Sequence, residues 1–123
     1  MATGVASTEI ARAGIPPAAA KWLLGDVDAA VTAVGTDETD GYQIVKKWTL
    51  ITGGSSKVVV LPTPAQAGEW YGIVNDSANT NTIYPPSGVT INGTTTLSIA
   101  DNKSCICFAV SATSYYSIPF APT

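Results

Sequence analysis

Residues Lys57 to Pro86 read KVVVLPTPAQAGEWYGIVNDSANTNTIYPP. It contains three short apolar runs, at residues 58–61, 70–74 and 82–84, and each run ends at Pro or at a polar turn rich in Asn and Asp. Short apolar runs bounded in this way are typical of buried strands joined by tight loops. The stretch therefore predicts an all-β domain.

The residues upstream extend this pattern. Residues 42–52, YQIVKKWTLIT, are predicted to form the first long strand, and Lys46 interrupts its alternation, which indicates a bulge or a sheet edge. Residues 58–61 are apolar on both parities, as expected for a central strand or for one whose outer face meets another subunit. Gly72 within the next strand indicates a bulge or a close approach of another group to the backbone.

The downstream half adds further strands. Asn92-Gly93 is the strongest short hairpin signal in the chain, because both residues tolerate the positive φ of a type I′ turn, and it is predicted to join residues 89–91 to residues 95–99. With the last two strands, at residues 105–110 and 115–120, this makes seven or eight short strands. Strands at this spacing predict a jelly-roll-like antiparallel β-sandwich over residues 26–123.

The strand at residues 105–110 alternates regularly. One parity carries larger apolar residues and is predicted to face the core: Ile106, Phe108 and Val110. The other parity carries small apolar residues, which a lone sandwich does not need on an outer surface, and it is predicted to form a subunit interface: Cys105, Cys107 and Ala109. The two cysteines lie at i and i+2, which strains a disulfide, so both are expected to be buried and reduced in a chain made in a cytoplasm.

Residues 1–25 differ from the rest because they are rich in Ala and lack strand alternation. Pro17 is suited to the first position of a short helix over residues 18–24, and Gly25 to its end. Such a short helix is marginal unless it docks on something. The segment is therefore read either as a frayed terminus or as an arm that binds a neighbouring subunit or a capsid through four apolar residues: Ile15, Trp22, Leu23 and Leu24.

Charge and composition exclude several functions. Charged residues are 12% of the chain, below the roughly 25% of ordinary soluble domains, and the net charge is −3. The six basic residues are scattered, so binding to nucleic acid or to an anionic membrane is not expected. A neutral polar surface is common in proteins that pack against copies of themselves.

Catalytic chemistry is not expected either, nor a cofactor. The chain has no His, so neither a Ser-His-Asp nor a Cys-His arrangement can be assembled. The one carboxylate beside aromatic residues is Glu69, and a glycosidase would need a partner such as Asp76 across a cleft. Residues 26–41 are expected to form a solvated loop, in which an irregular ion site at Asp37, Glu38 and Asp40 is the alternative to plain solvation.

A resemblance to a known family comes from residues 35–118. The segments VVVLP, AQAG, IVNDSANTNTIYPPSGVTING and CFAVSATSYYSI, with the upstream GTDETDGYQI and TLITGGSS, resemble small structural proteins of tailed bacteriophages, among them head decoration (cement) proteins and tail or fibre proteins. The matching positions, which the resemblance implies are architectural, are Val60, Leu61, Pro62, Gly68, Val74, Asn75, Asn79, Thr80, Tyr84, Pro85, Gly88, Ile91, Asn92 and Gly93.

This resemblance implies a virion protein on the capsid surface, with no enzymatic activity. Decoration proteins of this kind resemble trimers that sit at local three-fold positions and bind the major capsid protein, and residues 1–25 are expected to supply the capsid contact. The alternative is a tail or fibre module that recognises a host glycan through an exposed aromatic residue such as Trp70 or Tyr84.

Overall fold

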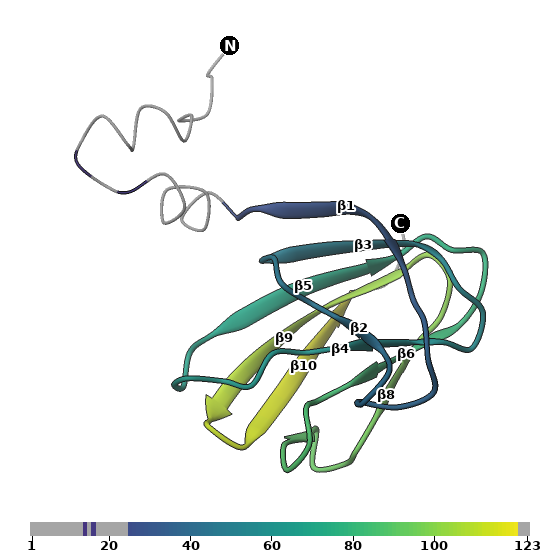
Figure 1. Cartoon of the computed structure of the whole chain (residues 1–123). Helices are drawn as coiled ribbons and strands as arrows, with labels where there is room; N and C mark the ends of the chain where they lie inside the picture. Colours follow the sequence, from purple (N-terminus) through teal and green to yellow (C-terminus); the bar gives the residue numbers. More distant parts are fainter. Residues whose placement is uncertain (1–13, 15, 17–24, 121–123) are drawn as a thin grey trace.

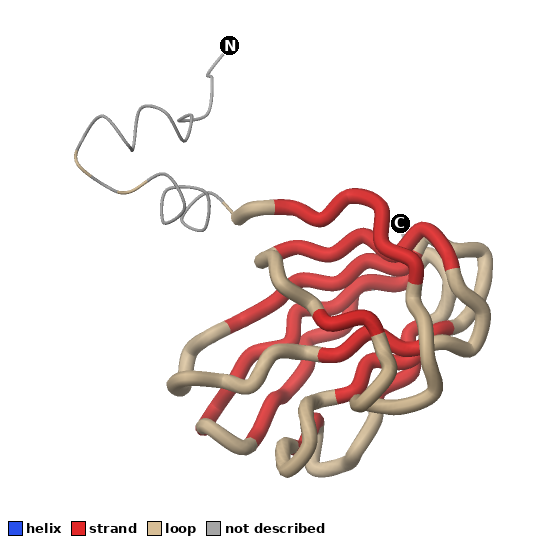
Figure 2. The backbone as a smooth tube through the Cα atoms, viewed as in Figure 1, coloured by secondary structure: helices blue, strands red, loops and turns tan. Residues whose placement is uncertain are grey.

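The computed structural model describes residues 25–120 together with Gly14 and Pro16. Within this part of the chain the structure is all-β, with two sheets that enclose one core (Figures 1 and 2). The strands are β1 (Val27–Thr32), β2 (Tyr42–Gln43), β3 (Trp48–Gly53), β4 (Val58–Val60), β5 (Trp70–Asn75), β6 (Asn81–Tyr84), β7 (Thr90–Ile91), β8 (Leu97–Ile99), β9 (Lys103–Ser111) and β10 (Ser114–Phe120). No helix in the described residues is long and apolar enough to cross a membrane.

The first six strands alternate between the sheets, so the chain winds in coils. The six-stranded sheet has the order β1-β3-β5-β9-β10-β7 and the four-stranded sheet the order β2-β4-β6-β8. Each coil adds one strand to each sheet, in parallel with the strand of the previous coil. Trp48 pairs with Gly72 and Val59 with Ile83, the same offset of 24 residues in both sheets. The arrangement is that of a short solenoid.

The predicted antiparallel jelly roll is therefore wrong in its strand pairing, although the all-β class is confirmed. Five of the eight strand pairings among the described residues are parallel. The antiparallel pairings come late in the chain, where β9 pairs with β5 and β10, and β8 pairs with β6. A turn such as residues 54–57 can return the chain to the same sheet or carry it to the opposite sheet, and its local sequence is compatible with both.

Two predicted elements differ in extent from those of the structure. The expected strand over residues 42–52 is divided into β2 and β3, which lie in different sheets. The expected solvated loop over residues 26–41 contains β1, which carries the buried Val31 and forms one edge of the six-stranded sheet. The rest of that loop covers the outside of β4, because Gly41 packs so closely on Val58 and Val60 that an added Cβ would lie 2.5 and 2.7 Å from their methyl groups.

The Asn92-Gly93 turn is confirmed, but it does not open a hairpin ladder. Both residues have positive φ, 53° and 75°, and Ile91 and Thr94 exchange two backbone hydrogen bonds of 2.9 Å. Beyond this bridge the flanking strands separate, since β7 pairs with β10 and β8 pairs with β6.

The core between the sheets is filled by aliphatic side chains and by two tyrosine rings, those of Tyr71 and Tyr115. Asn75 and Asn81 are also fully buried, at the corner where the chain passes from β5 to β6. The Asn75 amide donates to the carbonyls of Asn79 and Ile99, at 2.7 and 2.8 Å. Buried polar side chains with satisfied donors hold such corners in a single conformation.

Candidate functional site

Five of the eight exposed large apolar residues in the described part of the chain lie on the outer side of the six-stranded sheet. Because side chains alternate along a strand, each strand that lines the core on one parity presents the other parity outward. On β3, β5, β9 and β10 the outward residues are apolar almost throughout. We call them the outer apolar face: Trp48, Leu50, Trp70, Val74, Ile106, Phe108, Val110, Tyr116, Ile118 and Phe120.

The strand register makes this face continuous. Phe108 of β9 pairs with Trp70 of β5 on one side and with Tyr116 of β10 on the other. One step along, Ile106 pairs with Gly72 and with Ile118. Directly opposed side chains of neighbouring strands touch. The apolar residues therefore form two adjacent rows that cross β5, β9 and β10, which lie side by side in Figure 1.

A tryptophan pair ends the face at its β3 side. The Trp48 ring lies over Gly72, where an added Cβ would come within 2.0 Å of two ring carbons. The two indoles meet edge to face, with centroids 5.3 Å apart and planes at 75°. The Lys47 Nζ lies 4.0 Å from the Trp70 centroid, a cation–π contact. Burial lowers the pKa of Lys47, and the charge of Glu69 acts in the opposite direction.

The sequence prediction for β9 is wrong about which parity faces the core. The residues predicted at a subunit interface lie inside the domain, with exposed fractions of 5%, 0% and 2%: Cys105, Cys107 and Ala109. Those predicted to form the core point outward: Ile106, Phe108 and Val110.

The reason is the size of the neighbouring core residues. Cys107 pairs with Tyr71 of β5, and Ala109 pairs with Tyr115 of β10. These two tyrosine rings lie in the core and meet edge to face, with their centroids 6.5 Å apart. Small side chains on the strand between them leave room for the rings, since a core is packed to nearly constant density.

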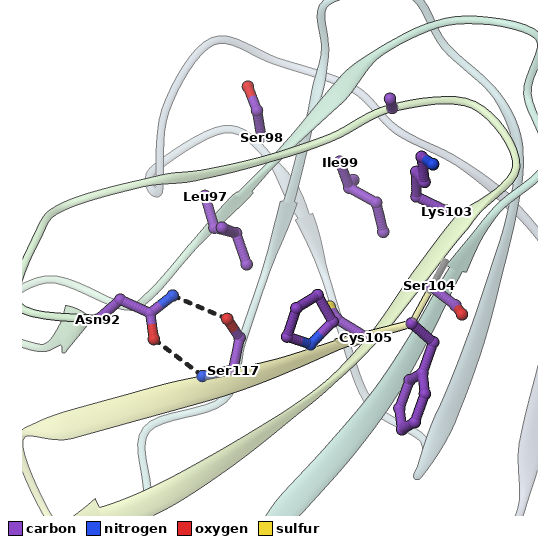
Figure 3. Close-up of a pocket in the computed structure, with 11 residues that line it drawn as sticks. Asn92, Leu97, Ser98, Ile99, Lys103, Ser104, Cys105 and Ser117 are labelled. Carbon is purple, nitrogen blue, oxygen red and sulfur yellow. Dashed lines mark hydrogen bonds between the residues drawn. The ribbon is translucent and has the colours of Figure 1, made fainter. Parts of the chain in front are cut away.

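A second candidate feature is a hollow of about 640 Å³ where the two sheets separate. It opens there because β7 pairs with β10 at Ser114 and Tyr115, and no other described strand lies beside the rest of β10 on that side. Figure 3 shows Leu97 and Ile99 of β8 on one side of the hollow, and Cys105 and Ser117 on the other.

Two of the polar residues that line the hollow bond to each other. The Asn92 amide donates to the Ser117 hydroxyl at 2.7 Å, and the Ser117 N–H donates to the Asn92 carbonyl oxygen at 2.9 Å (Figure 3). Among the described residues that line the hollow, Lys103 is the single charged one and none is a carboxylate, so these residues offer no general acid–base pair.

The candidate catalytic carboxylates are too far apart. Glu69 precedes β5 and Asp76 follows it, so a seven-residue step of extended chain separates them, about 23 Å at roughly 3.3 Å per residue. Glycosidase carboxylates lie roughly 5–9.5 Å apart. Glu69 instead accepts hydrogen bonds from the backbone N–H groups of Ala65 and Gln66, at 2.5 and 3.3 Å, and so closes its own loop.

The acidic loop before β2 is closed in the same way. Asp40 accepts the N–H groups of Thr36 and Asp37, at 2.7 and 2.9 Å, and these hydrogen bonds lower its pKa. Asp37 accepts the N–H and the hydroxyl of Thr39. In residues 25–120 no three acidic or cysteine side chains come together in a group that could hold a metal ion.

The remaining predicted site residues fall into two groups. The four residues assigned to a capsid-binding arm, Ile15, Trp22, Leu23 and Leu24, lie outside the described residues. Of the two aromatic residues considered for glycan stacking, Trp70 has the Trp48 ring and Lys47 against it, and Tyr84 borders a small hollow of about 90 Å³ beside Pro85 and Pro86. Comparison with protein-family models and with curated proteins gives no match to this chain.

Proposed function

We propose that this chain is a structural protein of a tailed-bacteriophage virion, a decoration protein that binds across neighbouring subunits of the capsid and stabilises the head. The observation that best supports a structural role is the outer apolar face, a broad sheet surface made of ten uncharged side chains. The resemblance of residues 35–118 to phage structural proteins supports a phage virion as the particle to which the protein belongs.

In this proposal the domain contributes rigidity and the segment before it contributes the capsid contact. In the sequence, residues 1–25 contain a group of apolar residues, with Trp22, Leu23 and Leu24 consecutive. An oligomer, expected as a trimer, would present several such segments at once. Linked binding segments raise the apparent affinity without new contacts in each segment, provided that their spacing matches that of the capsid sites.

The experiment is co-sedimentation of the purified full-length protein with decoration-free capsids of its own particle. We expect saturable binding and an increase in the temperature at which the capsids break open. A full-length variant with Trp22→Ser, Leu23→Ser and Leu24→Ser should lose binding while its domain stays folded, and Val45→Lys, on an exposed valine of the domain, should bind normally. Failure of the wild-type protein to bind capsids would contradict the proposal.

A tail- or fibre-associated glycan-binding module is the other function considered, and it has less support. A sugar stacks on a free aromatic face, whereas the Trp70 ring has Lys47 over it and meets the Trp48 ring edge to face. Binding of the protein to a glycan array, lost in Tyr84→Ala or Trp70→Ala, would favour this function over the capsid role.

A further inference from the structure

We propose that the outer apolar face is the contact between copies of this chain, so that each copy buries it against a second copy. This inference names the partner of the assembly step in the proposed function. It rests on the geometry of the sheet and is tested on the isolated protein, so it can fail while capsid binding holds, and the reverse.

The size of the face matches that of a protein–protein contact. Five of its side chains keep between 36% and 48% of their surface exposed: Val74, Val110, Tyr116, Ile118 and Phe120. With areas on the order of 200 Å² each, they expose about 450 Å² of mostly apolar surface. A standard interface buries roughly 800 Å² per partner, of which about 57% is apolar, or about 450 Å².

The chemistry of the face favours a copy of the same chain as its occupant. All ten of its side chains are uncharged, so the same surface on a second copy brings no like charges together. An uncharged surface favours a contact between copies, because no charged side chain of either copy would be buried there without a partner. Nucleic acid and anionic lipid would instead be recognised by basic side chains, and the lysine at the edge, Lys47, already covers Trp70.

The edge of β10 is protected against pairing with another strand. Its outward N–H at Ser117 is bonded to the Asn92 side chain, at 2.9 Å, and at Pro119 there is no N–H to donate. A proline and a capped donor at a sheet edge oppose the addition of a strand. Copies are therefore expected to associate through the face of this sheet rather than by extending it beyond β10.

The test measures the mass of the full-length protein by sedimentation equilibrium over a wide concentration range. We expect a mass of two or more chains that falls toward one chain on dilution. Ile118→Lys and Tyr116→Lys place a charge at exposed positions of the face, 48% and 45% exposed, and should weaken self-association at least about 30-fold. Val45→Lys, at a 62% exposed valine outside the face, is the matched control and should associate like the wild type.

Two further measurements keep the result interpretable. Urea unfolding of each variant at low protein concentration separates loss of association from loss of folding. Tryptophan emission in a Trp22→Phe background reports Trp48 and Trp70 at the face, and it should shift to the red on dilution of the wild-type surface but not further in Ile118→Lys.

The proposal would be overturned by a wild-type protein that stays a single chain at all concentrations. A single chain whose tryptophans stay shielded would assign the cover of the face to the residues before Gly25 instead. An oligomer whose mass is unchanged by both lysine variants would place the contact elsewhere on the domain.

Discussion

The hydroxyl of Tyr115 donates a 2.7 Å hydrogen bond to the backbone carbonyl of Pro62. This bond joins β10 of the six-stranded sheet to the loop that follows β4 of the four-stranded sheet. The Tyr115 side chain is fully buried, and its burial raises the pKa of the phenol. The contact is therefore a polar link between the two sheets inside an apolar core.

Tyr115→Phe should destabilise the domain by about 1–3 kcal/mol, because the Pro62 carbonyl loses its hydrogen-bond donor while the ring still fills the core. Urea unfolding at neutral pH measures the change. Tyr116→Phe is the matched control, since Tyr116 is the neighbouring residue on the exposed parity, and it should shift the free energy of unfolding by less than about 0.5 kcal/mol. Equal effects of the two variants would contradict the role of this bond.

Asn75→Asp should cost about 3 kcal/mol or more at neutral pH. The amide donates to two carbonyls and its oxygen accepts the Ser77 N–H, so a carboxylate there would face two carbonyl oxygens at a fully buried position. Burial would raise the pKa of the introduced carboxyl, so the folded variant binds its proton more tightly than the unfolded one, and the penalty relative to wild type should shrink as the pH falls. Asn79→Asp, exposed in the same turn, should be near neutral.

Gly72→Ala should destabilise the domain by about 1–3 kcal/mol, because the new methyl group would occupy the space of the Trp48 ring. The double variant Trp48→Ala/Gly72→Ala tests the cause. If the clash with the ring is responsible, the added cost of Gly72→Ala disappears once the ring is absent. An undiminished cost in the double variant would assign the effect to the backbone of β5.

Tyr42 should titrate at an alkaline pH above that of an ordinary tyrosine. The hydrogen bond from its hydroxyl to the Asp28 carboxylate, together with burial, raises the pKa of Tyr42 to about 12. The folded-state pKa lies above the unfolded value of 10.0, so the contribution of this bond to stability is present below pH 10 and is lost as the pH rises toward 12.

The measurement is an ultraviolet titration of the wild type minus that of Tyr42→Phe, which isolates this phenol. Asp28→Asn should move the Tyr42 transition back toward pH 10. A Tyr42 transition that does not respond to Asp28→Asn would exclude the carboxylate as its cause.

Cys105 should be alkylated before Cys107 in the native protein. Both cysteines are buried and unbridged, with sulfur atoms 3.8 Å apart, but Cys105 borders the hollow between the sheets and keeps 5% of its surface exposed, whereas Cys107 has none. The hydrogen bond with Cys105, and burial, raise the pKa of Cys107 and suppress its thiolate. Alkylation of the native protein followed by peptide mass mapping should label Cys105 first, and unfolding should expose both. Equal labelling in the native state would contradict this order.

The strands could be predicted where an apolar run and its boundaries are both local. The runs at residues 58–61, 70–74 and 82–84 correspond to β4, β5 and β6 within about a residue at each end, and the Asn92-Gly93 turn has the predicted positive φ values. Residues 27–32 are predicted as part of a solvated loop because residues 26–41 are rich in Asp and Glu, but Val27, Ala29 and Val31 share one parity and the segment forms β1. A repeat of 24 residues, visible in Pro62 and Pro86 at the ends of two coils, is the signal that would have indicated a solenoid.

The parity of β9 that faces the core could not be predicted from the local sequence. The alternation of β9 was visible in the sequence, but which parity faces the core depends on Tyr71 and Tyr115, which come from strands far apart in the chain. Only their rings, meeting across Cys107 and Ala109, make the small side chains the inner ones.

Backbone preferences and the spacing of apolar residues over a few positions are sufficient to predict that this chain is all-β, that its strands are short and that its turns lie at Gly, Pro and Asn. Strand pairing, strand direction and the exposed face of β9 depend instead on contacts between residues far apart in the chain. Those choices minimise the volume left unfilled between residues distant in sequence, and no local pattern encodes that volume.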